Sequence, residues 1–84
     1  NAYSILNGEY EIIEAEIIET SELVNKELKN SNLPDEIRIG AVLRGEEVII
    51  PRSNFVFKKE DIVVLLANKD FLHVVENMFR ISSI

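Results

Sequence analysis

The feature that most constrains the fold of this chain is a continuous apolar run from Ile62 to Ala67. A short strand that is apolar on every side is typical of the centre of a sheet, where other structure covers both of its faces. The run is far shorter than the ~18 residues that a membrane-spanning helix needs. We therefore expect a sheet built around residues 62–67, and no direct insertion into a membrane.

Three further segments have the patterns of strands. Residues 9–18 alternate between an apolar face, which holds Ile13, and a face that carries glutamates. Residues 37–44 and 47–51 flank Gly45-Glu46, which has the position and composition of a two-residue hairpin loop. Because Pro51 cannot donate a ladder hydrogen bond, the returning strand is expected to end there or to lie at an edge.

Two helices complete the expected fold. Thr20-Ser21 offers an N-cap for a helix over residues 22–29, and Asn68 offers one for a helix whose apolar positions recur at helical spacing from Phe71 to Phe79. Residues 55–57 have the composition of a short extra strand. The order is then β-α-β-β-(β)-β-α, which predicts an α+β domain with a small, mainly antiparallel or mixed sheet and two helices.

The charge of the chain is acidic and unevenly distributed. Its 84 residues have a formal net charge of −6, concentrated in residues 1–36, and an acidic surface repels nucleic-acid phosphates and anionic lipid. We expect no nucleic-acid partner. Because the chain begins with Asn1 and not with methionine, we expect a single domain over residues 1–84 excised from a longer chain, with residues 1–8 and 81–84 as flanking tails.

No group of residues has the spacing of a catalytic or metal site, so we expect no enzyme and no catalytic residue. His73 is the only histidine and is expected on the surface of the last helix. Glu14 and Glu16 share one face of the first strand, and we interpret them as a solvated outer strand and not as an acid/base pair. The three glycines, Gly8, Gly40 and Gly45, do not form a phosphate-binding loop.

The hairpin has two different faces. If Gly45-Glu46 is the loop, Arg44 lies opposite Glu47 and Val42 lies opposite Ile49. One face is apolar and is expected to be core: Ile37, Ile39, Ala41, Leu43, Val48 and Ile50. The other face is half apolar and holds two arginines: Arg38, Gly40, Val42, Arg44, Glu47, Ile49 and Pro51.

Three interpretations of this second face stay open. A helix of the same domain could cover it, a second copy of the domain could cover it in a symmetric dimer, or it could line a pocket for an anionic ligand, with Arg52 just beyond. For Arg44 the simplest interpretation is an ion pair with Glu47 across the hairpin. Gly40, which weakens a strand, indicates a bulge or a close approach of another group.

Residues 39–51, with the sequence IGAVLRGEEVIIP, resemble the signature of TrkA C-terminal domains, also called the C-terminal lobe of potassium-conductance regulators. Other segments agree in the same order, namely ETSELVNKEL at 19–28, LP at 33–34, DIVV at 61–64 and the helix at 71–79. The resemblance spans about residues 10–80. The chain departs from the family at Asn25, where a glycine is usual, and at Lys59-Glu60, where Pro-Gly is usual.

The resemblance implies a regulatory and dimerisation domain of a peripheral cytoplasmic subunit, at the inner face of the plasma membrane, that controls potassium transport. It implies a homodimer, and a membrane potassium-transporter subunit as partner of the full-length protein. It also implies that this domain holds no cofactor, since NAD or ATP would bind a Rossmann domain outside these residues.

In some relatives the family binds a regulatory ligand such as cyclic di-AMP at the dimer interface. The residues that correspond to that ligand site are Ile39, Arg44, Ile50 and Pro51. Arg52 is a further candidate, because it is cationic and follows Pro51 directly. Arg38, Val42 and Ile49 are the candidate interface residues. The alternative function is therefore a small-molecule sensor for an anionic nucleotide, attached to a Trk system or to a different transporter or antiporter.

Overall fold

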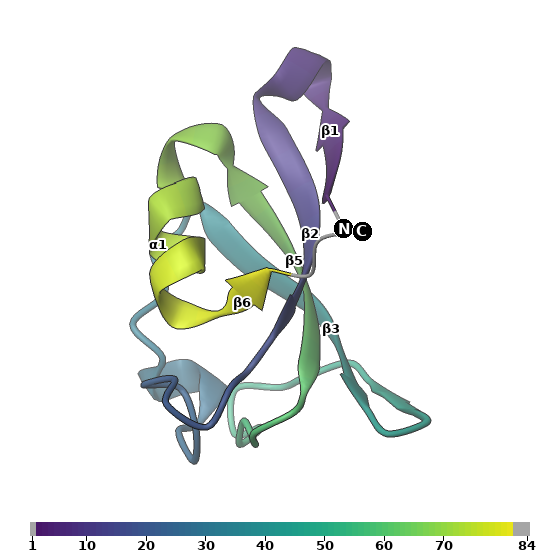
Figure 1. Ribbon diagram of the computed structural model, residues 1–84, viewed down its shortest axis with the longest axis vertical. Coiled ribbons are helices and arrows are strands. Elements are labelled where there is room, and N and C mark those ends of the chain that lie inside the picture. The colour runs from purple at the N-terminus through teal and green to yellow at the C-terminus, as the bar shows by residue number, and fades with distance from the viewer. Residues whose placement is uncertain (1, 82–84) are drawn as a thin grey trace.

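The computed structural model describes residues 2–81, in which one antiparallel sheet packs a single α-helix against one of its faces (Figure 1). The strands are β1 (Ala2–Ile5), β2 (Tyr10–Glu16), β3 (Ile37–Arg44), β4 (Glu47–Ile49), β5 (Ile62–Asn68) and β6 (Arg80–Ile81). The helix α1 spans Leu72–Met78, and short 3-10 turns occupy Leu6–Gly8, Leu28–Asn30 and Lys69–Phe71. The predicted α+β class is confirmed.

The apolar run lies at the centre of the sheet, as expected. The strand order is β1-β2-β5-β3-β4, and β6 pairs with the end of β2. On β5, the side chains of Val63, Leu65 and Ala67 are buried and point to the same face as α1, while Val64 and Leu66 on the opposite face stay partly exposed. Only one face of the central strand is therefore covered by the described residues.

The covered face is the hydrophobic core. Alternation along β2 places Ile13 and Ala15 in it, as predicted, and the side chains of α1 and of the loops fill the space above. At the start of the last helical segment, the side chain of Asn68 accepts a hydrogen bond from the backbone N–H of Asp70 at 2.9 Å, which confirms the predicted cap. The buried apolar residues are Ile13, Ala15, Ile17, Leu23, Ile37, Val42, Phe57, Val63, Leu65, Ala67, Val75, Met78 and Phe79.

The helix predicted over residues 22–29 is wrong, because these residues form turns that end in the 3-10 turn Leu28–Asn30. Asn25 has a left-handed backbone with φ 67°, which interrupts a right-handed helix. The backbone N–H groups of this segment bond instead to the carbonyls of residues 53–57, with Asn25 donating to Phe57 at 2.8 Å and Lys29 to Ser53 at 2.9 Å. The expected strand at 55–57 is accordingly a single bridge between Glu27 and Val56.

The ends of the described chain also join the sheet. Residues 2–8, expected as part of a tail, form β1 and a turn, and β1 pairs with β2 from Ala2 opposite Ile13 to Ile5 opposite Tyr10. Arg80 lies in β6, and residues 82–84 of the expected tail lie outside the described residues. Because β2 is flanked on both sides, it is not the outer strand that its glutamates suggested. No helix among residues 2–81 has the length and apolar character needed to span a bilayer.

Candidate functional site

The hairpin has the predicted register. Arg44 lies opposite Glu47, and Val42 lies opposite Ile49. Gly45 has φ 61°, the left-handed conformation that a tight two-residue loop requires and that glycine adopts without steric cost. The loop sequence alone was therefore enough to fix which residues of β3 and β4 are paired.

A bulge at Gly40 changes which side of the sheet each later residue of β3 faces. The pairing of β3 with β5 shifts between Ile39, opposite Leu65, and Ala41, opposite Val64. One extra residue in a strand inverts the alternation beyond it, since successive side chains point to opposite faces. A bulge at this glycine was one of the two expected explanations, and it is confirmed.

The inversion corrects the predicted core face of the hairpin. Val42, a candidate interface residue, is fully buried and packs in the core beside its partner Val63. Val48 and Ile50, predicted as core, are instead 65% and 72% exposed. Ile49 is half-buried against the core. Of the three candidate interface residues, only Arg38 is exposed, and it contacts Asp35 at 3.7 Å.

Arg44 holds the loop after β4 against the hairpin. Its Nε and Nη2 donate to the two carboxylate oxygens of Asp61 at 2.9 and 2.8 Å, and Nη2 also donates to the backbone carbonyl of Val56 at 3.0 Å. Asp61 is 1% exposed, and its carboxylate also accepts from the backbone N–H of Lys58 at 2.8 Å. We call this arrangement of Arg44, Asp61 and the loop that it ties down the Arg44 clamp.

The guanidinium of Arg44 is also held from one side by an aromatic ring. It lies 5.0 Å from the ring centroid of Phe55, which packs edge-to-face on the buried Phe57. The hydrogen bond to Asp61 raises the pKa of Arg44 above its usual value, and Glu47, opposite in the hairpin, adds a smaller attraction. The predicted interaction of Arg44 with Glu47 is thus weaker than its ion pair with Asp61. The sequence did not indicate Asp61 as a partner, because this residue lies outside the hairpin.

The candidate ligand residues are spread along the hairpin and the loop that follows it. Arg44 is committed to the clamp, whereas Ile50 and Arg52 are exposed and Pro51 is half-buried after the end of β4. Ile39, at the bulge, lines two cavities, one on each side of β3, and none of the other four candidates lines either of them. Their role in ligand binding stays a prediction.

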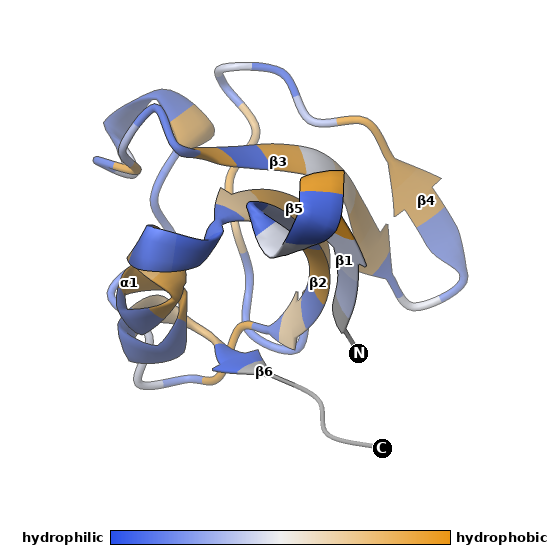
Figure 2. Ribbon diagram, turned by 90° about the horizontal axis from the view of Figure 1, so that it is seen from above, coloured by the Kyte–Doolittle hydropathy of each residue, from blue (hydrophilic) through white to orange (hydrophobic). Residues whose placement is uncertain are grey.

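The most extensive surface feature is the sheet face opposite α1, where no helix lies among the described residues (Figures 1 and 2). The strand pairing puts apolar side chains from five strands on this face, which we call the open face. Its apolar members are Tyr3, Ile5, Tyr10, Ile12, Ala41, Leu43, Val48, Ile62, Val64 and Leu66.

The open face is hollowed along its middle. A groove of about 410 Å³ runs between Ile5 and Ile12 on one side and Gly40 and Arg38 on the other, with Val64 and Leu66 as its floor. Alternation in β2 and β5 predicted that Ile12, Val64 and Leu66 each lie on one face of their strand. The unbroken apolar run of β5 indicated that this face is covered by other structure. Among residues 2–81 no element covers this face, which the sequence pattern did not indicate.

The residues considered for chemistry remain at the surface or in ion pairs. His73 is exposed on α1, as expected. Glu16 is half-buried on β2 and pairs with Arg80 of β6. Across residues 2–81, no three histidine, cysteine, aspartate or glutamate side chains lie close enough together to hold a metal ion.

Comparison with known proteins gives consistent matches. A family model described as the TrkA-C domain matches residues 12–80. The chain is 44% identical over 80 residues to the Trk system potassium uptake protein TrkA of Azorhizobium caulinodans. The matched region covers 95% of this chain and 18% of that protein. It is 36% identical over 84 residues to the protein of the same name from Vibrio alginolyticus, covering 95% of this chain and 18% of that protein. The chain thus spans less than a fifth of the length of these curated relatives.

Proposed function

The chain belongs to the TrkA-C domain family, and on this premise we propose that it is the regulatory and dimerisation domain of a peripheral cytoplasmic subunit that controls potassium uptake. The names of its relatives, Trk system potassium uptake protein TrkA, support potassium as the ion. Because the chain covers only 18% of such a relative, the remaining part of the full-length protein would contact the membrane transporter.

The observation that carries this proposal is the open face. Single exposed apolar residues are ordinary, but a continuous apolar surface across five strands is typical of a surface that another molecule covers. Tyr3 and Val48, near its two margins, are each 65% exposed, so the surface extends across the width of the sheet. We propose that a second copy of the domain covers it.

The charges on the open face fit a second copy. Arg38 on β3 and Glu14 on β2 share this face, on opposite sides of β5. In a twofold dimer each patch meets the same patch of its partner, so a surface with a cation on β3 and carboxylates on β2 can present opposite charges to itself. The apolar groove between them would then be closed by the partner.

The regulatory mechanism that follows is a bias on the packing of two domains. A ligand or partner that binds one arrangement of the dimer more tightly than another shifts the population toward it, and this shift is transmitted to whatever the domain is attached to. In the full-length subunit the attached part would control the conducting state of the transporter.

Two experiments test the proposal. Sedimentation equilibrium of the 84-residue chain should show a reversible dimer, and a strict monomer at high concentration, with and without candidate ligands, would contradict it. In the full-length protein, Ile12→Glu on the open face should alter potassium uptake by cells, because it places a charge in the proposed interface. Unaltered uptake with normal protein levels would argue against a regulatory role for this face.

The alternative function, a sensor for an anionic nucleotide such as cyclic di-AMP, is favoured by one observation. Arg52 is exposed next to Pro51 and forms no ion pair with any residue in the described part of the chain. An unpaired arginine is well suited to grip a phosphate. Arg44 is less available, because Asp61 and Val56 already occupy its Nε and Nη2 donors.

Calorimetry with a panel of nucleotides tests this alternative. Arg52→Ala should weaken the binding of any nucleotide found, and this variant is informative because the Arg52 side chain forms no ion pair within the described residues. Arg44→Ala is a poorer test, since it also breaks the clamp. The sensor hypothesis fails if no nucleotide binds, or if Arg52→Ala leaves the affinity unchanged.

A further inference from the structure

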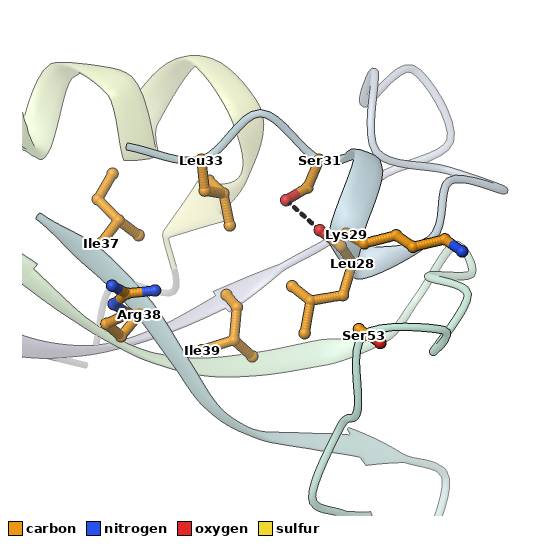
Figure 3. A pocket seen from close by; sticks show the side chains of 8 residues that line it. All are labelled: Leu28, Lys29, Ser31, Leu33, Ile37, Arg38, Ile39 and Ser53. Atoms are coloured by element: carbon orange, nitrogen blue, oxygen red, sulfur yellow. Dashed lines mark hydrogen bonds between the residues drawn. The ribbon is translucent and has the colours of Figure 1, made fainter. Parts of the chain in front are cut away.

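A second cavity lies on the covered side of β3, away from the open face. It is a trough of about 340 Å³ between β3 and the segment that contains the 3-10 turn Leu28–Asn30 (Figure 3). The side chains of Leu28, Leu33, Ile37 and Ile39 converge on it from both walls and form an apolar floor (Figure 3). Its volume lies in the range of pockets that hold small molecules, roughly 300–1,000 Å³.

The walls of the trough are fixed by backbone hydrogen bonds. Leu28 donates to the carbonyl of Phe55 at 2.8 Å, and Lys29 donates to that of Ser53 at 2.9 Å, so the 3-10 turn is tied to the loop after β4. On the opposite wall, the N–H of Ile37 bonds to Pro34 at 3.0 Å where the chain enters β3. The cavity is therefore formed before any ligand arrives, which reduces the entropic cost of binding.

The rim of the trough is cationic in an otherwise acidic chain. Lys29 and Arg38 flank the apolar floor on opposite sides (Figure 3), and no carboxylate is among the lining residues. The local charge of +2 contrasts with −6 for the whole sequence. The hydroxyls of Ser31 and Ser53 add polar groups, and that of Ser31 donates to the carbonyl of Leu28 at 2.7 Å.

Both cations are available to a ligand. Lys29 reaches Glu27 at 3.9 Å and Arg38 reaches Asp35 at 3.7 Å, and the side chains of Lys29, Arg38 and Asp35 are more than half exposed. Surface pairs with such long separations contribute little, on the order of 0–1 kcal/mol, and are easily exchanged for a better anion. A carboxylate or phosphate that also buries an apolar body would gain from both parts of the trough.

We propose that this trough binds a small organic anion, a carboxylate or phosphate with an apolar body, which Lys29 and Arg38 hold over the leucine and isoleucine floor. The site lies on the other side of β3 from the groove of the open face, with which it shares Arg38 and Ile39, and it does not require the proposed dimer. It also differs from the hairpin arginines, because neither Arg44 nor Arg52 lines it. A ligand here would contact the 3-10 turn, the loop after β4 and β3 together, and so stabilise their arrangement.

Proton–nitrogen correlation NMR of the 84-residue chain tests the proposal, with octanoate below its micelle-forming concentration as the probe and 1-octanol as the neutral molecule of equal chain length. Octanoate should shift the amide signals of residues 28–39 and Ser53 in a saturable way, with a Kd at least about tenfold lower than that of octanol, because two cations then contribute charge-assisted hydrogen bonds. The double variant Lys29→Gln/Arg38→Gln should raise the octanoate Kd about tenfold and leave the weaker octanol binding unchanged.

The matched control is Lys59→Gln, which removes an exposed cation that lines neither cavity and should leave the octanoate Kd unchanged. A well-dispersed spectrum for each variant shows that the fold is retained. The proposal is overturned if octanol binds as tightly as octanoate, if the double variant binds octanoate like the original chain, or if the shifts centre on Ile12, Val64 and Leu66 of the open face. Because Arg38 also lines the groove of the open face, sedimentation of the double variant measures any effect on dimerisation separately.

Discussion

At the scale of single residues, the Arg44 clamp gathers several polar contacts on one side chain. Arg44 forms a bidentate ion pair with Asp61, which is 1% exposed. It also donates a hydrogen bond to the backbone carbonyl of Val56 and makes a cation–π contact with Phe55. A buried carboxylate without its cation is costly, because desolvation is no longer offset by a partner. The clamp therefore stabilises the loop after β4 in the position that closes the core over Phe57.

Arg44→Met tests this role, since it removes the charge and keeps much of the apolar stem. We expect the free energy of unfolding to fall by about 2–3 kcal/mol, below the full range for a buried pair because the Arg44 side chain is itself 37% exposed. Urea denaturation measures the loss. Arg38→Met, which removes an exposed arginine paired at 3.7 Å, should change the same quantity by less than about 0.5 kcal/mol. Equal effects of the two variants would contradict a clamp at Arg44.

Two residues at which the chain departs from its family adopt the backbone that glycine favours. Asn25 has φ 67° and Glu60 has φ 73°, both in the left-handed region, at positions where the family resemblance leads us to expect glycine. Asparagine tolerates this conformation, but for glutamate it costs about 1–2 kcal/mol. The glutamate is thus strained, and its N–H nonetheless donates to the carbonyl of Ile17 at 2.7 Å.

Glu60→Gly should consequently stabilise the domain. The relief of strain exceeds the entropy that glycine adds to the unfolded chain, so we expect a gain of about 0.5–1 kcal/mol in the free energy of unfolding. Thermal or urea denaturation provides the measurement. The neighbouring Lys59→Gly is the matched control: Lys59 is not among the positive-φ residues of the described chain, so that change should lower stability by a similar amount. Destabilisation by both variants would show that Glu60 is not strained.

At the scale of elements, the bulge at Gly40 determines which face of the sheet the later side chains of β3 point to. Before the bulge at Gly40, the side chain of Ile37 faces the core; after it, Val42 and Arg44 do, and Leu43 moves to the open face. The bulge thereby directs Arg44 toward Asp61 and leaves Val48 of the edge strand β4 uncovered. A β3 without the bulge would exchange the two faces and lose the clamp.

Truncation of one valine from each face tests the inversion. Val42→Ala should lower the free energy of unfolding by about 2 kcal/mol, because it removes buried methyl groups and leaves a cavity. Val48→Ala should change it by less than about 0.5 kcal/mol, since Val48 is 65% exposed. Strict alternation along the hairpin predicts the opposite order, so urea denaturation of the two variants decides between the two arrangements.

The elements differ in how well the sequence predicted them, for physical reasons. The hairpin register follows from the local chemistry of Gly45-Glu46, and the last helix follows from its apolar period and the Asn68 cap. The segment 22–29 has helical composition, but its backbone groups are taken by residues 53–57, a tertiary competition that a local pattern does not contain. Gly40 indicated a bulge, but the predicted faces of the hairpin did not include the inversion that a bulge causes in the later side chains of β3.

At the scale of the whole molecule, the covered and open faces of the sheet are unequal. A central strand that is apolar on both sides needs cover on both sides, and α1 with its neighbouring loops supplies only one. The sequence predicted cover on both faces of this strand, whereas the described residues cover only one of them. That mismatch is the physical basis for proposing a second copy as the partner.

We propose different roles for the two sides of β3, namely binding of a small anion in the trough and dimerisation through the open face. The open face is broad and apolar, as interfaces between copies of a chain are, while the trough is narrow, rimmed by Lys29 and Arg38, and suited to a small anion. Ile39 lines both cavities. Arg38 lines both as well, so a ligand in the trough would affect the open face through these two side chains and the strand that holds them.

Sedimentation equilibrium of two charge variants tests whether the open face is the interface between two copies of the chain. Ile12→Glu places a carboxylate in the middle of the open face, where the side chain is 37% exposed in the single chain, and His73→Glu adds the same group to the exposed side of α1 on the opposite face. We predict that the original chain and His73→Glu dimerise with similar Kd, and that Ile12→Glu raises the Kd at least about a hundredfold, because burying an unpaired charge costs roughly 3 kcal/mol or more. An original chain that stays monomeric, or a dimer that Ile12→Glu leaves intact, would contradict the assignment of the open face as the interface.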